Sequence, residues 1–543
     1  GRQVMLSSEE LLHYNASVND VHNIDVLLGV NTNKEQAFSM YGYGLRGVSD
    51  DVYYYNPQKV PPVVNHGTPE FPEYAATRYY SSNFTEKRMV SYFGRLGYNY
   101  KQRYLLEFTF RRDGSSTFGE GNRWANFPSV AVGWSFSEEP FIKRLTGGWL
   151  NWGKIRGSYG KSGQTFTSAY LAHGLMNIMD KSFFGKTGIT TDKPVSPYLT
   201  WEKTRQYDLG LDMDMFNYRL NVKLDYYDTY TSSLIYDIPI PGSLYTFGAQ
   251  VENAMEISNE GLELELQADI LRESAVSWRM KFNMARNWNR FEKSYSGKDV
   301  VDGDGTLLVV GRPLNGLYVW AHRGYYNSDA EVPRLYKIDG QEIYFNGVAT
   351  NGISGAVGDY RLLDLDGDGN PDSYYAGSPL PLAHGGWVNE LMWKNFDLNV
   401  LVNFTIGRKM INNRMGLGFS RQSEDGHLTK LFDYRKLRPW DGVNKKPNAP
   451  AWGNSLSMNT DSAIEKVHHL ALKQITLGYN LPDRISKKAG FSGVRFFLTA
   501  ENLFYLSNYS GGNPEVVNIY TGRDNGDTYP LPRKYTLGLT LNF

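Results

Sequence analysis

The residues best suited to chemistry in this chain form one acidic segment. Aspartates occupy positions 1, 3 and 5 of this segment and glycine occupies position 6, as in the front half of an EF-hand loop. The predicted ligands of a calcium- or magnesium-type cation are Asp364, Asp366, Asp368, Asn370 through its backbone carbonyl, and Asp372. The glycine permits a sharp turn, so the carboxylates converge, and a hard cation offsets their repulsion.

Two features weaken the analogy with an EF-hand. Tyr375 stands at the twelfth position, where an EF-hand supplies a bidentate glutamate, and no helical pattern flanks the loop. The alternative interpretation is a solvated acidic turn within a long surface loop, and the residues leave both interpretations open. A cation bound here is expected to have a structural role.

Other reactive residue types do not form a recognisable site. His468 and His469 are neighbours in a predicted strand, so they point to opposite faces and cannot share a metal by themselves. Gly160-Lys161-Ser162 is similar to the end of a phosphate-binding loop, but Ile155 stands where that motif needs its first glycine. We find no constellation that supports catalysis, and the sequence predicts a protein that is not an enzyme.

Composition excludes several classes of protein. The 543 residues include 14% aromatic residues, 39 of them tyrosine, which suit the headgroup level of a membrane. Mean hydropathy is −0.47, and no run of about 18 apolar residues predicts a transmembrane helix. The net charge is zero and no long basic run is present, which argues against nucleic-acid binding. Cysteine is absent, which excludes disulfides and thiol chemistry.

The clearest local pattern is a β-hairpin at residues 207–226. Large apolar residues occupy every second position of both strands, and the positions between them are dense in charge. Phe216-Asn217 is predicted to form the turn. A face with this charge density is solvated in a sandwich and lines a water-filled lumen in a large barrel.

The same alternation recurs along the chain. It predicts further strands near residues 22–43, 88–100, 103–112, 128–137, 152–160, 262–270, 278–284, 386–394, 396–406, 463–481, 493–507 and 535–543. With the hairpin, this makes about fourteen strands, and residues 7–17 would add one more. The apolar phase changes within 463–481, which predicts a β-bulge near Lys473-Gln474.

Short and long connections are predicted to alternate strictly. The long ones fall at 44–87, 113–127, 161–203, 237–255, 291–385, 409–462 and 508–533. Short periplasmic turns and long extracellular loops are typical of an outer-membrane barrel. The loop region 291–385 carries rings that could stack on a solute or pack the loop against itself, and Tyr53, Tyr54 and Tyr55 share this ambiguity. The rings of that region are Tyr318, Trp320, Tyr325, Tyr326, Tyr344 and Tyr360.

The chain ends on an alternating strand with an aromatic terminus. Its apolar face consists of Tyr535, Leu537, Leu539, Leu541 and Phe543. An unpaired apolar edge of this kind favours aggregation in water, whereas a membrane barrel pairs the edge and turns the apolar face to lipid. We predict that these residues are a C-terminal barrel-assembly signal. The alternative is an ordinary last strand.

Ten short segments resemble, in order, the C-terminal half of SusC/RagA-type TonB-dependent transporters of the Bacteroidetes outer membrane. They include Arg111-Arg-Asp-Gly-Ser-Ser-Thr-Phe118, Lys154-Ile-Arg-Gly-Ser-Tyr-Gly160, Asn259-Glu-Gly-Leu-Glu263, Leu472-Lys-Gln-Ile-Thr-Leu-Gly-Tyr479 and Tyr529-Pro-Leu-Pro-Arg533. The resemblance implies an all-β transmembrane antiparallel barrel of about 22 strands with a plug inside it. It also implies a SusD-like surface lipoprotein as a lid, energy from TonB, and dimers of barrel–lid pairs.

The chain departs from this family at its start. It shows no TonB box and no plug domain, and it has too few strands. We therefore expect residues 1–543 to be the C-terminal portion of a longer transporter, whose plug and remaining strands lie in a separate chain or a further segment. The expected location is the outer membrane, with extracellular loops and a periplasmic C-terminus.

The predicted function is active import of oligosaccharides or oligopeptides, with the chain forming the wall of the solute cavity. One rival is a passive porin, or a structural barrel in a larger outer-membrane assembly, which an inward-folded constriction loop would favour. A second rival is a secreted all-β adhesin, which the alternation of short and long connections disfavours. The sequence does not distinguish a glycan from a peptide substrate.

Overall fold

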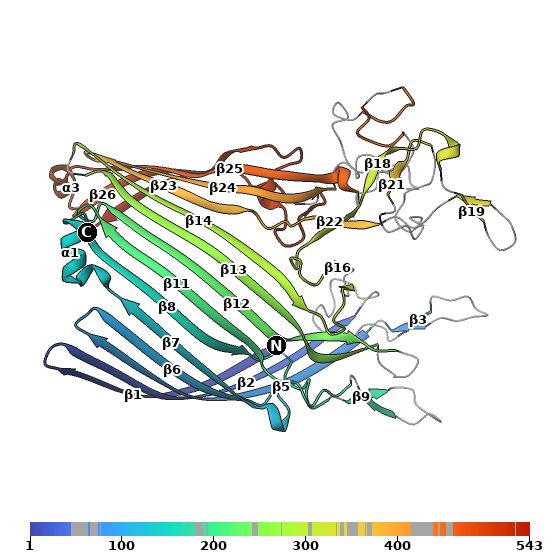
Figure 1. The fold of residues 1–543 in the computed structure, drawn as a ribbon, viewed down its shortest axis with the longest axis horizontal. Coiled ribbons are helices and arrows are strands. Elements are labelled where there is room, and N and C mark those ends of the chain that lie inside the picture. Colours follow the sequence, from blue (N-terminus) through green and yellow to red (C-terminus); the bar gives the residue numbers. More distant parts are fainter. Residues whose placement is uncertain are drawn as a thin grey trace, which may run out of the picture. The chain divides into compact units, whose positions relative to one another are not determined.

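A computed structural model describes most of the chain. The described residues are 1–44, 63–65, 74–76, 78–166, 168–174, 176–179, 188–191, 194–241, 248–272, 274–301, 307–332, 334–336, 342–344, 357–363, 365, 372–413, 438–443, 446–451, 460–526 and 528–543. Most of these residues lie in β-strands, and the strands follow one another in chain order (Figure 1).

One 16-stranded sheet contains nearly all of the long strands. In sheet order they are β1 (Arg2–Val18), β2 (His22–Gly44), β5 (Arg78–Tyr100), β6 (Tyr104–Ser115), β7 (Trp124–Trp134), β8 (Leu150–Gln164), β11 (Glu202–Met215), β12 (Leu220–Pro239), β13 (Ala249–Leu271), β14 (Val276–Lys293), β23 (Ala383–Trp393), β24 (Phe396–Asn412), β25 (Ile464–Asn480), β26 (Gly493–Ser507) and β28 (Lys534–Asn542). The pairings from β1 to β7 and from β14 to β28 are antiparallel. A two-residue strand, β27 (Arg523–Asp524), runs parallel to β24. These strands confirm the all-β prediction and the number of strands.

The chain divides into two compact units. The first comprises Gly1–Trp134, Gly157–Tyr207 and Tyr230–Glu256, and the second comprises Ser135–Arg156, Asp208–Thr229 and Ile257–Phe543. Strands β8, β11, β12 and β13 continue from one unit into the other along the chain.

The connections carry small elements of their own. The short strands are β3 (Val63–Asn65), β4 (Tyr74–Ala76), β9 (Met176–Met179), β10 (Gly188–Thr191), β15 (Val300–Val301), β16 (Leu307–Leu308), β17 (Leu317–Trp320), β18 (His322–Tyr325), β19 (Arg334–Tyr336), β20 (Glu342–Tyr344), β21 (Tyr360–Leu362) and β22 (Ser373–Gly377). The helices are α1 (Pro140–Thr146) and α3 (Asp483–Lys488), with 3-10 turns η2 (Glu120–Asn122), η3 (Phe136–Glu138), η5 (Asp329–Glu331), η7 (Asp461–Ala463) and η8 (Pro514–Val516). None of the helices in the described ranges is long and apolar enough to cross a membrane.

The register confirms the predicted separation of faces. Residues directly opposite in neighbouring strands share a face, and Phe404 opposes Leu470 while Leu498 opposes Leu537. The apolar face is the exposed one, since Leu537 is 81% exposed and Leu498 is 48% exposed. A water-soluble sheet buries its apolar face, so this arrangement is the reverse of a soluble core.

The predicted bulge in β25 is confirmed. Leu401 opposes Gln474 and Val402 opposes Leu472, so Lys473 is the extra residue. The extra residue keeps Leu470 and Leu472 on the same face as Ile475 and Leu477, although the two pairs differ in sequence phase.

Two expectations about boundaries were wrong. The predicted strand 128–137 ends instead at Trp134, and residues 136–138 form η3. The predicted strict alternation of connection length also fails, because the β6–β7 connection at 116–123 is shorter than the α1-bearing connection at 135–149. The sequence prediction followed apolar alternation, whereas the observed strands extend past the apolar stretch and include residues expected in loops.

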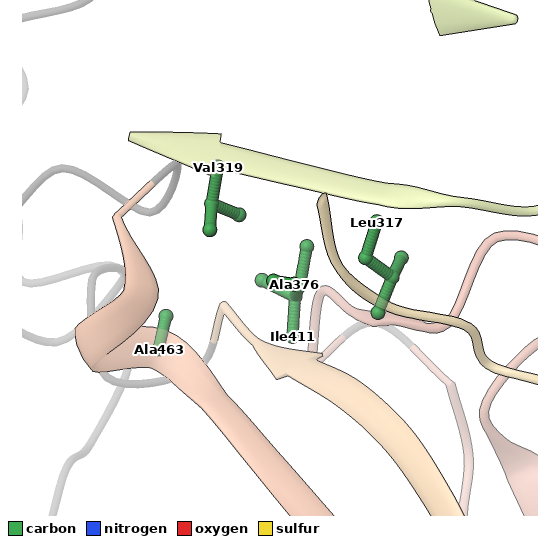
Figure 2. Close-up of a cluster of buried hydrophobic side chains, with 5 residues drawn as sticks. All are labelled: Leu317, Val319, Ala376, Ile411 and Ala463. Carbon is green, nitrogen blue, oxygen red and sulfur yellow. The ribbon is translucent and has the colours of Figure 1, made fainter. Parts of the chain in front are cut away.

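A small buried cluster joins the loop strands to the ends of the long strands (Figure 2). It is formed by Leu317 and Val319 of β17, Ala376 of β22, Ile411 of β24 and Ala463 of η7. Val319 is 1% exposed and Ile411 is fully buried. The loop strands β17 and β22 are therefore packed onto the ends of β24 and β25 rather than extended into solvent.

We predict that deleting Lys473 preserves the fold. The deletion removes the bulge and makes Leu472 the neighbour of Gln474, so the two segments come into one phase and Leu470 and Leu472 stay on the apolar face. The purified protein in detergent is expected to keep its protease-resistant folded form, as is the control in which the exposed Val443 is deleted from a connection. Loss of resistance after deletion of Lys473 alone would show that the bulge itself is needed for the pairing of β25.

Candidate functional site

The polar face of the second unit contains a cluster of one arginine and three aspartates. Arg156 of β8 donates from Nε to Asp212 Oδ2 at 3.1 Å and from Nη1 to Asp208 Oδ1 at 3.2 Å, both on β11. Its third nitrogen donates to Asp225 of β12. One guanidinium thus links three strands through charge-assisted hydrogen bonds.

A glycine makes room for this guanidinium. Gly210 lies between Asp208 and Asp212 on the same face of β11, and a Cβ there would come within 2.3 Å of Arg156 Cζ. Gly478 has the same role beside the pair of Arg495 and Asp397, because a Cβ there would meet both oxygens of Asp397 at 2.4 Å. At both places the ion pair occupies the space that a side chain at the glycine would fill.

Further ion pairs follow along the same face. Arg279 pairs with Asp269 at 2.7 Å and Lys281 pairs with Glu390 at 2.7 Å. Arg495 pairs with Asp397 at 2.5 Å, and Asn480 donates to the same carboxylate. Together with the Arg156 cluster, these pairs hold neighbouring strands in register on the side that carries no apolar band.

The connection between β26 and β28 folds back onto β24 and β25. We call residues 508–526 the inner segment. Arg408 of β24 is 4% exposed and donates to the backbone carbonyls of Pro514, Val517 and Asn518 at 2.7–3.1 Å. Met410 and Val467 are fully buried in a cluster with Tyr509 and Val517 of the segment. Arg408 opposes Val467, which lies on the face of His469, so the segment covers the polar face.

A polar groove lies beside the inner segment. Its volume is 630 Å³, and its lining includes Asn221, Lys223, Glu265, Gln267, Lys281, Asn283, His384, Asn403, Thr405, His469 and Glu515. The charges are paired, with Lys223 3.5 Å from Glu265 and Lys473 3.2 Å from Glu515. His469 Nδ1 is buried and has no hydrogen-bond partner within the described part of the chain. The groove offers amides, hydroxyls and balanced charge, which suit a neutral polar solute.

The loop strands form a second polar cluster, built on tyrosines. The rings of Tyr325 and Tyr360 stack at 5.3 Å, and His322 pairs with Asp461, which also accepts from Tyr374 at 3.3 Å. Tyr360 is 1% exposed and its hydroxyl accepts from Ser462 at 2.9 Å. Burial raises the pKa of both Tyr325 and Tyr360, and it raises the pKa of Tyr318 to about 12.

These contacts bear on the tyrosines predicted for solute stacking. Tyr318, Tyr325, Tyr326 and Tyr360 pack within the loop, as the alternative interpretation of these rings expected. The side chains of Tyr344 and of Tyr53 to Tyr55 lie outside the described residues.

The predicted cation loop is described only at its end. Asp364, Asp366, Asp368 and Asn370 lie outside the described residues. Asp372 is described, and its Oδ2 accepts a hydrogen bond from the backbone N–H of Leu365 at 2.5 Å. Within the described ranges, no group of three or more metal-binding side chains occurs. Cation binding at this loop remains a prediction.

The two histidines and the terminal strand lie as the sequence indicated. His468 is exposed, whereas the side chain of His469 is 7% exposed beneath the inner segment. Tyr535, Leu537, Leu539, Leu541 and Phe543 are all exposed, and the first four lie on the face that they share with the opposite residues of β26. The role of these five residues in assembly remains a prediction.

Sequence reasoning missed the residues that organise the polar face. Arg156, Arg408 and Glu515 were not singled out, because their partners are 42 to 110 positions away in sequence. Glycines between acidic residues, as in Asp208-Leu-Gly210-Leu-Asp212, are the one local signal that could have indicated a bound arginine.

Comparison with known proteins gives one family. The family model described as "TonB dependent receptor-like, beta-barrel" matches residues 10–400. TonB-dependent receptor P3 of Formosa agariphila is 28% identical over 570 residues, which cover 99% of this chain and 52% of the relative. TonB-dependent receptor SusC of Bacteroides thetaiotaomicron is 30% identical over 492 residues, which cover 87% of this chain and 45% of the relative. The chain thus spans about half the length of the curated relatives it matches.

A solved structure agrees at the level of the fold. The structure titled "Structure of the RagAB peptide transporter" matches all of this chain and 56% of that chain, with a TM-score of 0.78 and 22% sequence identity. At this identity the likeness concerns the fold, and it confirms the predicted class of barrel.

We predict that Arg156→Gln destabilises the protein. The substitution leaves three carboxylates close together without their cation, and removal of one partner of a fully buried pair costs about 3–5 kcal/mol. The Arg156 side chain is 33% exposed, so solvent screening reduces the expected loss to about 1–3 kcal/mol. Urea unfolding followed by tryptophan fluorescence measures it. Arg88→Gln, which breaks the more exposed Arg88–Glu86 pair, is the control, and its expected loss is smaller than that of Arg156→Gln. Equal losses of stability in the two variants would show that the Arg156 cluster stabilises the fold no more than an exposed ion pair does.

We also predict that the tyrosine cluster loosens in alkali. The pKa of Tyr318 rises from 10.0 to about 12 on burial, so the folded state holds the phenolic proton more tightly than the unfolded state does. This contribution to stability is complete below pH 10.0 and is lost as the pH rises toward about 12. Ultraviolet titration of tyrosinate is expected to show a delayed fraction that shrinks in Tyr318→Phe. A fraction that is unchanged in the variant would refute the assignment.

Proposed function

Because the chain belongs to the TonB-dependent receptor-like β-barrel family, we propose that it forms the C-terminal barrel wall of a SusC-type active importer. The observation that carries the proposal is the two-faced sheet of this family's fold. Its apolar side chains are exposed on one face, and its ion pairs and polar groove lie on the other. In a closed barrel the first face meets lipid and the second lines the lumen.

The orientation follows from the connections. We place the long connections, including residues 291–385, outside the cell and the turns near α1 and α3 in the periplasm, with Phe543 also periplasmic. The exposed apolar residues from Tyr535 to Phe543 then form the signal read by the assembly machinery. The acidic segment from Asp364 to Asp372 lies in an outer loop, where a calcium- or magnesium-type cation would fix its turn.

The proposed partners follow from the family and from the length of the chain. A plug domain and the remaining strands complete the barrel, a SusD-like lipoprotein covers its outer end, and TonB supplies energy. Pairs of barrel and lid associate as dimers. The solute is an oligosaccharide or an oligopeptide, and the solved relative titled a peptide transporter supports the second of these. The family is one of receptors and transporters rather than of enzymes.

A passive porin is the second candidate function. The inner segment, held by Arg408 and by its contacts with Met410 and Val467, folds across the polar face as a constriction loop would. In a porin this segment would set the pore size and no energy coupling would be needed.

An uptake experiment separates the two candidates. Cells that lack the full-length protein are complemented with wild type or Arg408→Ala and given labelled oligosaccharides or oligopeptides. If the protein is an importer, the wild type restores uptake of either the oligosaccharides or the oligopeptides, and a protonophore abolishes this uptake. It also predicts co-purification of a SusD-like lipoprotein. Uptake that resists the protonophore, with larger single-channel conductance in Arg408→Ala, would favour the porin instead.

The orientation can be tested separately, since the chain contains no cysteine. Glu120→Cys lies at an exposed position of the β6–β7 connection, and Lys488→Cys lies on α3. A membrane-impermeant maleimide added to whole cells is expected to label the first variant and not the second until the outer membrane is opened. The reverse pattern would overturn the assignment of the two ends.

A further inference from the structure

The apolar face of the first unit can be followed as rows across β1, β2, β5, β6 and β7. Residues that are directly opposite share a face, so each row is a line of neighbouring side chains. One row joins His22, Tyr100, Tyr104 and Trp134 at the short-turn end. Another joins Val90, Gly114 and Trp124 near the β6–β7 connection.

These two rows have the separation expected of membrane interfaces. From Val90 to Tyr100, β5 advances ten residues, or roughly 33 Å at about 3.3 Å per residue. A strand tilt of about 40° reduces this to about 25 Å, the height of the apolar band of an outer-membrane barrel. Tyr100 and Tyr104 stack at one end, and Tyr92 and Trp124 stack at the other. The aromatic rings thus mark the two headgroup levels.

A groove interrupts the apolar band between these levels. Leu28 opposes Gly94 on β5, and Gly94 opposes Phe110 on β6, so one position of this row has no side chain. The groove has a volume of 720 Å³, and its exposed walls are almost entirely apolar. They include Leu28, Tyr92, Leu96, Phe108 and Phe110, which are 41–52% exposed.

One end of the groove carries a positive charge. Arg112 lines this end and its guanidinium lies over the ring of Trp124, with Cζ 5.2 Å from the ring centroid. No ion pair involving Arg112 is present in the described part of the chain. The adjacent Arg111 points to the opposite face, where it pairs with Asp113 at 2.8 Å. Glu10 also lines the groove but lies three strands from Arg112, about 14 Å at the usual spacing between strands.

We propose that this groove is a lipid-binding site for a phosphorylated, multiply acylated glycolipid of the lipopolysaccharide class. One acyl chain lies over Gly94 between Tyr92, Leu96 and Phe110, and a headgroup phosphate contacts Arg112. A guanidinium suits phosphate because it presents paired donors in a planar fork. Trp124 holds that fork at the headgroup level while leaving its edge open.

The choice of lipid rests on the proposed function. Arg112 is next to the β6–β7 connection, which the proposed orientation places outside the cell. The groove therefore opens to the outer leaflet, where the glycolipid is the phosphate-bearing lipid. Glycerophospholipid would be the occupant if the two ends of the strands were reversed.

Native mass spectrometry of the full-length transporter tests the site. The delipidated protein is placed in phosphatidylethanolamine nanodiscs, and purified lipid A is titrated in. We expect one lipid A to stay bound to wild type at collision energies that remove the phospholipid. Arg112→Glu is expected to reduce retention at least about tenfold, the change produced by losing one charge-assisted contact worth about 1.4 kcal/mol.

Two further variants distinguish a shaped site from general attraction. Gly94→Leu fills the groove and is expected to reduce retention as Arg112→Glu does. A Cβ there comes within 3.1 Å only of Leu28 Cδ2, the end of a flexible and exposed side chain, so folding is expected to survive. Arg88→Gln is the control and is expected to retain the lipid. Arg112→Lys is expected to retain less lipid than wild type but more than Arg112→Glu, because an ammonium keeps the charge and lacks the planar fork.

Three outcomes would overturn the proposal. Equal retention in wild type and Arg112→Glu would show that no headgroup site exists, and unaffected retention in Gly94→Leu would show that no acyl groove exists. Preferential retention of phosphatidylethanolamine over lipid A would identify the occupant as a glycerophospholipid. Retention is measured without transport, so a negative uptake result leaves this test intact, and a negative lipid result leaves the importer intact.

Discussion

Backbone hydrogen bonding in a solvent without water is the constraint on which this structure depends. Each N–H and C=O within a bilayer must find a partner in the protein, and a continuous antiparallel sheet supplies that partner from the neighbouring strand. β2 and β5 pair without interruption from His22 opposite Tyr100 to Gly44 opposite Arg78. Because side chains alternate along such strands, the sheet must have two faces with opposite solvents. The exposed leucines of β28 and the ion pairs around Arg156 are two consequences of this one rule.

Away from the inner segment, ion pairs rather than apolar packing order the polar face. Arg156, placed over Gly210, holds β8, β11 and β12 together, and Arg495, placed beside Gly478, links β26 to β24. Charge-assisted hydrogen bonds therefore hold the strands together on this face, as apolar packing does in a soluble protein. A missing side chain has a second use on the opposite face, where Gly94 leaves a groove in the apolar band.

The inner segment and the loop strands show how connections are held to this sheet. Arg408 satisfies three backbone carbonyls of residues 514–518, and the cluster around Ile411 and Val319 fixes β17 and β22 to the strand ends. These connections carry small buried clusters of their own. In the proposed importer, such connections would form the surfaces that meet the solute and the lid.

The sequence by itself determined the strands, their faces and the bulge at Lys473. The alternation of apolar and polar residues can be read within each strand, without knowing which strand pairs with it. It also predicted the family, through short segments in a fixed order. Strand ends were less accurate, since β7 stops at Trp134 and other strands continue into polar residues that carry no periodic signal. Only the tertiary structure decided which charges meet, which segment folds inward, and where a groove opens. Arg408 lies 106 to 110 positions from the carbonyls it binds. The groove over Gly94 exists only because the sheet places Leu28 and Phe110 on either side of it.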